Sequence, residues 1–496
     1  MALAEPLLKA EHADADASPY WADEGVREVS CASTADTVSE DAAAADRDVW
    51  TEDCVRKNSG NLLHSIDDKV EVDNAPMHPS LPPLGSPQRA PLSPGRCMED
   101  NNLMTGAEAT FTVVNFTMNV GLLTLPCLFA RHGWSAGILM AFAGASCACT
   151  ALFLQNSLVT LVRRGIPLPD FPDLAREAIG ARFAVIAHVV AQIEIVGYMC
   201  CNLIALANGL AATAPSLTEP QAMIISSGIC VALAAISDRL FAYCALMSTT
   251  SMVAIFASLL LWGTEFETWA QPSTLVSDVS YMPASFAVII FTAGAHPLIP
   301  CVMHSTRSRH EYRSALRLSW TFFSIFAIVA GGMAFYMYGH SLRPLITDNI
   351  GRNLHLQNEP GGGAMRKTGG IWVLVKLFGS VIPSSRPTVR LLGKQIGVDL
   401  PAGNGGFKSV LVTAPLLCAV AGVSQLLSPY VAAFESAIGC VITSFNALFF
   451  PSLTYLAICQ PKDIKLRLCA GFFVLVGAAL PIATFLPQVL PLAYKL

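Results

Sequence analysis

The chain has 496 residues, of which 53% are hydrophobic and only 14% are charged, and its formal net charge is −5. Ordinary soluble domains carry about 25% charged residues, so this composition excludes a soluble globular protein and is typical of a membrane protein. The charge is unevenly distributed, because residues 1–100 contain 8 Lys and Arg against 20 Asp and Glu while the rest of the chain is net basic.

The first segment, residues 1–104, is predicted to be a disordered, acidic, cytosolic tail. It lacks an apolar run of spanning length, is rich in Ala, Asp, Glu, Ser and Pro, and ends in a proline-rich stretch at 79–94. Such a composition cannot bury enough apolar surface to fold by itself. The N-terminus turns acidic early, which argues against a secretory signal or a transit peptide.

From Ala107 onward, apolar runs recur with the length that a hydrocarbon core of about 30 Å demands of an α-helix. The predicted spans are 107–130, 135–162, 183–213, 221–237, 241–263, 282–303, 315–338, 370–391, 408–427, 430–458 and 467–490. They form a transmembrane domain, residues 105–490, which a short C-terminal tail, 491–496, follows. The sequence therefore predicts an all-α polytopic membrane protein with about eleven transmembrane helices.

The eighth span differs from the others. Its apolar core is short, contains Lys376 and ends at Pro383. We therefore expect this span to be tilted, broken or only partly inserted. Most Lys and Arg residues of the loops and span ends fall on the side of the N-terminal tail, and positively charged loops stay in the cytosol. The tail is thus predicted to be cytosolic.

Two spans, the first and the sixth, contain residues that interrupt helices. These are Asn115, Asn119, Gly121 and Pro126 in the first span and Gly294, His296, Pro297 and Pro300 in the sixth. Proline removes a backbone donor and glycine lowers helix propensity. The freed backbone groups need protein, substrate or water as partners inside a membrane. Ordinary proline kinks are the alternative explanation.

Matching breaks in two groups of five spans indicate an inverted-repeat transporter with its site between the discontinuous helices. Half-helix ends offer amides to a carboxylate and carbonyls to an ammonium group, and an amino acid carries both charges. The predicted substrate-binding residues are Asn115, Asn119, Val120, Gly121, Leu122, Phe291, Ala293, Gly294 and His296.

Ionisable residues inside the spans are a second kind of candidate. Glu194 is the predicted proton-coupling residue, because burial disfavours a charged carboxylate and so suits proton exchange. A neutral Glu194 that is hydrogen-bonded within the bundle is the alternative. His296 could sense pH or contact the substrate, or it could simply pack. Lys376 could occupy a coupling-ion position, neutralise a carboxylate, or be solvated.

The first span, NFTMNVGLLTLPCLFARHGW at Asn115–Trp134, resembles the opening helix of the amino acid/auxin permease family, although Asn119 stands where a glycine is common. FPDLAREAIG at Phe171–Gly180 resembles the loop of that family after its second helix. GAHPLIP at Gly294–Pro300 is similar to a segment of its plant vacuolar and vesicular inhibitory amino acid transporter branch, with Ala295 as an extra residue. The resemblance implies a leucine-transporter-like fold of five plus five repeated helices and one more.

These observations predict a secondary active amino acid transporter, not an enzyme, which is proton-coupled and works by alternating access. An amino-acid-sensing receptor that signals through the tail is the alternative, and a passive channel is a third. No phosphate-binding motif, metal site or cofactor is expected, and protons or Na⁺ are the possible coupling ions. The expected partners are the amino acid and the lipid bilayer, without nucleic acid. We expect a vacuolar or other endomembrane location, with the plasma membrane as the alternative.

Overall fold

The computed structural model describes residues 103–493 apart from 167, 215, 237, 264–271, 273–274, 276–280, 343–345, 350–359 and 399–405. The described residues all belong to one compact unit, Cys97–Leu496. The predicted N-terminal tail, 1–104, lies outside the described residues except for 103 and 104. The predicted C-terminal tail, 491–496, is described only as far as residue 493.

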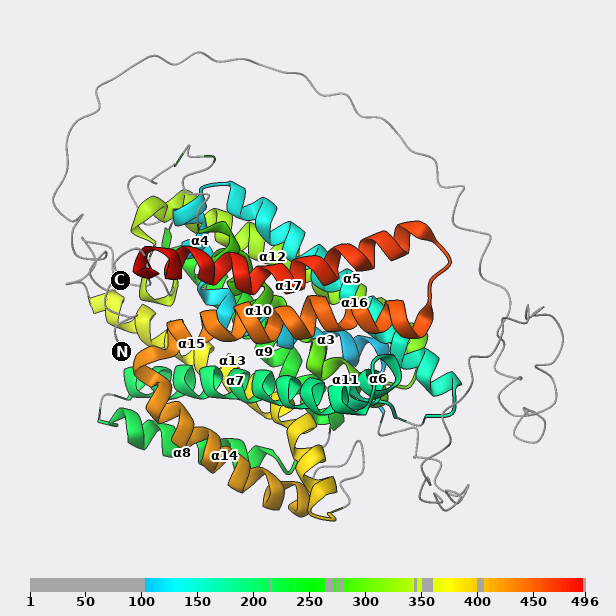
Figure 1. Ribbon diagram of the computed structural model, residues 1–496. Helices are drawn as coiled ribbons and strands as arrows, with labels where there is room; N and C mark the ends of the chain where they lie inside the picture. The colour runs from blue at the N-terminus through cyan, green and yellow to red at the C-terminus, as the bar shows by residue number, and fades with distance from the viewer. Residues whose placement is uncertain are drawn as a thin grey trace, which may run out of the picture. The chain divides into compact units, whose positions relative to one another are not determined.

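Helices make up almost all of the described structure (Figure 1). The α-helices are α3 (Gly106–Thr117), α4 (Leu125–His132), α5 (Ser135–Arg163), α6 (Phe171–Ala178), α7 (Ala181–Thr213), α8 (Glu219–Leu233), α9 (Asp238–Gly263), α10 (Met282–Ala293), α11 (Ile299–His304), α12 (Arg309–Tyr338), α13 (Pro360–Gln395), α14 (Phe407–Leu427), α15 (Val431–Ala437), α16 (Phe450–Thr454) and α17 (Ile464–Ala493). The short connecting helices are η2 (Val120–Leu123), η3 (His296–Leu298), η4 (Gly339–Ser341), η5 (Ile346–Asn349), η6 (Ser428–Tyr430), and the π-helical η7 (Ile438–Thr443), η8 (Phe445–Phe449) and η9 (Tyr455–Cys459).

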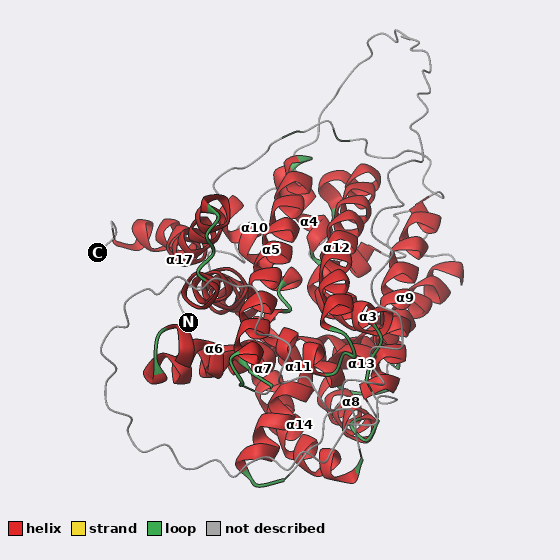
Figure 2. Cartoon of the chain, turned by 90° about the vertical axis from the view of Figure 1, so that its right-hand side faces the viewer, coloured by secondary structure: helices red, strands yellow, loops and turns green. Residues whose placement is uncertain are grey.

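The helices pack side by side, with α13 against α7 and α9, and α12 against α3 and α5. Figures 1 and 2 show α17 on one side of the bundle, away from α8 and α14, which pack against each other. Large apolar side chains lie exposed on the outward faces, for example Leu468 and Leu475 of α17 and Ile325 of α12. A soluble protein rarely exposes so many, whereas lipid covers such faces in a membrane.

The structure confirms an all-α polytopic membrane protein, but not the number of eleven spans. In the described part of the chain, eight helices are long and apolar enough to cross a membrane, and a ninth span results if α3 and the following helix count as one. The helix α8 is shorter, with 15 residues, and α13 is not among the apolar spans. Eleven spans therefore stays a prediction.

The eighth predicted span is longer than the sequence indicated. It was expected at 370–391, possibly broken at Pro383, but α13 is a continuous helix of 36 residues that contains both Pro383 and Pro387. A break in this span is therefore wrong, whereas tilt and partial insertion stay predictions. Polar side chains of α13 are buried against its neighbours, Lys376 and Arg386 among them, so its low hydropathy reflects contacts inside the bundle.

Candidate functional site

The first predicted span is interrupted where the sequence indicated. The helix α3 ends at Thr117, η2 starts at Val120, and the axis of Gly106–Thr117 makes an angle of 56° with that of Gly121–His132. Asn119 lies at the break in an extended conformation, and its Oδ1 accepts a hydrogen bond of 2.8 Å from the Gly121 amide. The side chain therefore supplies a partner for one of the amides that the break frees.

The prolines of both spans begin new helices. Pro126 occupies the first turn of α4, Pro297 that of η3 and Pro300 that of α11. A proline in the first turn costs no helical hydrogen bond, because an amide there has no intrahelical acceptor. The alternative of ordinary proline kinks within continuous helices is thus wrong for the described residues of these spans.

The sixth span is interrupted at Gly294 and Ala295, between α10 and η3, although the segment Met282–His304 still has the length and apolarity of one span. Gly294 is needed for close approach. A Cβ atom there would lie 2.5 Å from the Thr443 methyl carbon and 2.8 Å from the Ile290 carbonyl oxygen, so any larger residue would collide with both.

The carbonyls of Phe291, Thr292, Ala293 and Gly294 all lie within hydrogen-bond reach of side-chain donors from other segments. Tyr198 Oη lies 2.8 Å from Phe291 O and also contacts Gly294 O. Asn119 Nδ2 donates to Thr292 O at 3.2 Å. Trp320 Nε1 donates to Ala293 O at 3.0 Å. Helix C-termini leave such carbonyls without intrahelical partners. The bond from Asn119 also joins the two breaks directly.

Glu194 is buried and lies one turn before Tyr198 on α7. Its Oε1 accepts a hydrogen bond of 3.1 Å from Tyr198 Oη, and its Oε2 accepts one of 2.6 Å from Asn446 Nδ2 of η8. Tyr198 Oη has a single proton but three acceptors within reach, namely Glu194, Phe291 O and Gly294 O. The carboxyl group and the sixth-span break therefore compete for one proton.

Asn115 connects the first span with α13. Its Nδ2 donates to the Gly379 carbonyl oxygen at 2.9 Å, and its Oδ1 accepts from Ser248 Oγ at 2.6 Å and from Ser380 Oγ at 3.0 Å. Gly379 lies four residues before Pro383, which has no amide hydrogen to donate to it. Asn115 thus fills the position of the hydrogen bond that the proline removes.

A small cavity of about 10 Å³ lies between the two breaks, α7 and α13. Its lining residues are Asn115, Phe116, Asn119, Tyr198, Asn202, Gly294, Leu298, Ser380 and Ser384. Asn202 Oδ1 is buried and has no hydrogen-bond partner among the described residues. A cavity of this size has room for about one water molecule. The lining residues are buried and most of them have polar side chains, and the cavity is too small for an amino acid in this conformation.

The predicted substrate-binding residues fall into three groups. Asn115, Asn119 and Gly294 line the cavity. Gly121, Leu122, Phe291, Ala293 and His296 do not, and the side chain of Val120 lies outside the described residues. His296 is buried beside Thr150, with 3.0 Å between its Nε2 and Thr150 Oγ1. Its role in pH sensing, in substrate contact or in packing stays a prediction. The role of each residue in substrate binding stays a prediction.

Sequence reasoning missed several cavity residues, although a signal for them existed. Tyr198 and Asn202 continue the spacing of four residues from Glu194 along α7, and Ser380 and Ser384 have the same spacing along α13. Residues four apart share one face of a helix. Polar residues at this spacing in an otherwise apolar helix indicate a face that points to a polar interior.

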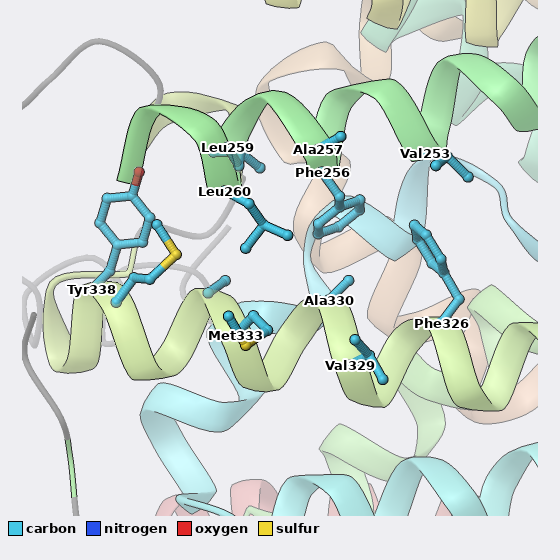
Figure 3. A pocket seen from close by; sticks show the side chains of 12 residues that line it. Val253, Phe256, Ala257, Leu259, Leu260, Phe326, Val329, Ala330, Met333 and Tyr338 are labelled. Atoms are coloured by element: carbon cyan, nitrogen blue, oxygen red, sulfur yellow. The ribbon is translucent and has the colours of Figure 1, made fainter. Parts of the chain in front are cut away.

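A larger cavity of about 150 Å³ lies elsewhere, between α9 and α12 (Figure 3). Its lining is apolar apart from the Tyr338 hydroxyl and includes Phe256, Leu260, Val329 and Met333. Val329 is 56% exposed, so the cavity opens on an outward face. It has no groups to hold the two charges of a zwitterion, so the small polar cavity is the better candidate for the site.

Comparisons with known proteins bear on the family and the fold of the chain. Residues 104–485 match the family described as transmembrane amino acid transporter protein. Amino acid transporter AVT1D of Arabidopsis thaliana is 20% identical over 401 residues, which cover 76% of this chain and 68% of that protein. Amino acid transporter AVT1E of the same plant is 21% identical over 395 residues, which cover 75% of this chain and 70% of that protein.

Among solved structures, a mutant manganese transporter of Eremococcus coleocola has a TM-score of 0.55 at 13% identity, and the match covers 80% of this chain and 89% of that chain. This likeness concerns the fold alone, and it agrees with the transporter fold predicted from the sequence. The family match extends over most of the chain and includes both broken spans. The chain therefore belongs to the transmembrane amino acid transporter family, as its resemblance to the amino acid/auxin permeases predicts.

Proposed function

We propose that this protein is a secondary active transporter that moves amino acids by alternating access around its two broken spans, with protons as the coupling ion. The observation that carries the proposal is the meeting of both breaks at one small cavity, whose lining residues are mostly polar and to which Glu194 is connected through Tyr198. The amino acid class of substrate follows from the family.

The substrate would enter after the helices separate, since the cavity between them has room for only about one water molecule. The hydrogen bond from Asn119 to Thr292 O joins the two breaks and would have to open in that step. Asn202 Oδ1 is a buried acceptor without a hydrogen-bond partner among the described residues, and it could receive a substrate ammonium group. Alternating access then consists of opening this cavity to one side of the membrane and then to the other.

Glu194 would couple protons to the movement through the single proton of Tyr198. A neutral Glu194 can donate its own proton to Tyr198 Oη, which leaves the tyrosine proton for Phe291 O or Gly294 O. An ionised Glu194 attracts the tyrosine proton and leaves those carbonyls with one donor fewer. Protonation therefore stabilises the closed break, and deprotonation favours its opening.

The resemblance of GAHPLIP, at Gly294–Pro300, to the plant vacuolar branch supports a vacuolar or other endomembrane location. The positive loops on the side of the tail support a cytosolic N-terminus.

The test is uptake of labelled neutral amino acids by the full-length protein in proteoliposomes. We expect a pH gradient to accelerate uptake by the wild type. Glu194→Gln keeps an oxygen that can accept from Tyr198, but it cannot exchange a proton, so its uptake should no longer respond to the gradient. Glu435→Gln is the matched control, because Glu435 is a second carboxyl group within a predicted span that has no assigned role. Unchanged stimulation by the gradient in Glu194→Gln would refute coupling through this residue.

A further inference from the structure

Lys376 of α13 is a buried lysine to which the proposed function gives no role. Its side chain is 1% exposed. Nζ donates to the Asn115 carbonyl oxygen at 3.1 Å, to Asn115 Oδ1 at 2.5 Å and to Ser380 Oγ at 3.0 Å. An ammonium group has three hydrogens, so these three oxygens satisfy it completely. The protonated form of Lys376 therefore fits this position.

No carboxylate forms an ion pair with Lys376 in the part of the chain that the structure describes. A buried charge is costly and normally has an opposite charge as its partner. Among the described residues, the compensation comes from dipoles. Asn115 lies in the last turn of α3, where the helix dipole is negative and attracts a cation.

The break of the first span creates the carbonyl that Lys376 uses. In a continuous helix the Asn115 carbonyl would accept from the amide four residues later, at Asn119, but Asn119 has left the helix. Ser248 Oγ of α9 adds a further oxygen, 2.6 Å from Asn115 Oδ1 and 3.3 Å from Ser380 Oγ. One backbone carbonyl, one amide oxygen and two hydroxyl groups from three helices thus converge.

Neutral carbonyl and hydroxyl oxygens are the ligands that hold a hard cation, and unwound carbonyls of broken helices coordinate the coupling ion in transporters of this kind. We propose that the Lys376 ammonium group is a tethered cation. It occupies the position that a free Na⁺ would otherwise take at the first break, and it fixes α3 to α13. This inference rests on the proposed function, in which protons are the coupling ion. A lysine that fills the cation position makes transport independent of Na⁺.

The first experiment measures the cation site without transport. The melting temperatures of purified wild type, Lys376→Ala and Lys465→Ala are compared in NaCl and in choline chloride at equal ionic strength. Lys465 is exposed and serves as the matched control. The wild type and Lys465→Ala should melt at the same temperature in both salts. Lys376→Ala should melt lower in choline chloride and rise by several degrees in NaCl, because Na⁺ binds the oxygens that the lysine has vacated.

The second experiment measures uptake in proteoliposomes with the same salts. Wild-type uptake should not depend on Na⁺, whereas Lys376→Ala should lose uptake in choline chloride and regain part of it in NaCl. A Na⁺ requirement of the wild type, in melting or in uptake, would overturn the proposal even if Lys376→Ala cannot be purified in folded form. The proposal would also be overturned if the melting temperature and the uptake of Lys376→Ala were the same in NaCl and in choline chloride. If Na⁺ stabilises Lys376→Ala but the wild type transports no amino acid, the cation site stands and the proposed function fails.

Discussion

At the scale of single residues, the breaks depend on side chains that do two things at once. The carboxamide of Asn119 both accepts from the Gly121 amide and donates to Thr292 O. A glycine could do neither. The sequence indicates the break, because asparagine and glycine are poor helix formers. It cannot indicate the contact with Thr292, which lies 173 residues further along the chain.

Gly294 gives a test of the tight packing at the sixth-span break. We expect Gly294→Ala to cost about 1–3 kcal/mol of stability and to reduce uptake, because its Cβ would press on Thr443 and on the Ile290 carbonyl oxygen. Gly228→Ala is the control, since Gly228 is exposed on α8 and a Cβ atom there would meet no described atom within 4 Å apart from the backbone of its own helix. Alanine favours a helix there. Thermal unfolding in detergent and proteoliposome uptake measure both effects. Equal stability of the two variants would show that the break tolerates a larger residue.

At the scale of elements, the apolar runs of the sequence predicted helical segments well, because spanning length and hydropathy are local properties. The exception is α13, whose polar face (Lys376, Ser380 and Ser384) lowers its hydropathy although the helix is continuous. The π-helical turns were not predictable either. Asn446, which donates to Glu194, lies on η8, one of these turns. No local sequence signal indicates this contact, which joins residues 252 positions apart.

Whether the Asn115 side chain replaces the backbone hydrogen bond that Pro383 removes can be tested by a double-mutant cycle. Asn115→Ala should destabilise the wild type by about 1–3 kcal/mol, partly because the Gly379 carbonyl loses its donor. Pro383→Ala restores an amide that can donate to Gly379 O within the helix. Asn115→Ala should therefore cost less in the Pro383→Ala background, by about 0.5 kcal/mol or more.

The other contacts of Asn115 are lost equally in both backgrounds, so they cancel in the cycle. Melting temperatures of the four proteins in detergent measure the coupling. Strict additivity would mean that the Asn115 amide does not replace the missing backbone bond.

At the scale of the whole molecule, the transporter unit begins close to residue 104. The family match starts at residue 104, and the first described contacts join Met104 to the segment after α11, with 2.8 Å between Met104 N and Ser305 O and 2.9 Å between Arg307 N and Met104 O. Thr105 and Glu108 then form a capping box at the start of α3. The acidic tail precedes all of these contacts, and its prediction as a separate segment rests on composition alone.

Deletion of residues 1–100 should therefore leave transport intact, because it spares the Met104 contacts and the capping box of α3. We expect unchanged uptake in proteoliposomes and an unchanged melting temperature in detergent. Deletion of residues 1–108 is the contrasting control, since it removes the Thr105 cap, worth about 1 kcal/mol, together with the Met104 contacts. A full-length protein that binds amino acids without moving them, and that loses its signalling output but not its binding on deletion of residues 1–100, would instead favour a receptor that acts through its tail. Because the two deletions differ by eight residues, only the shorter one isolates the tail from the anchoring of the first broken span.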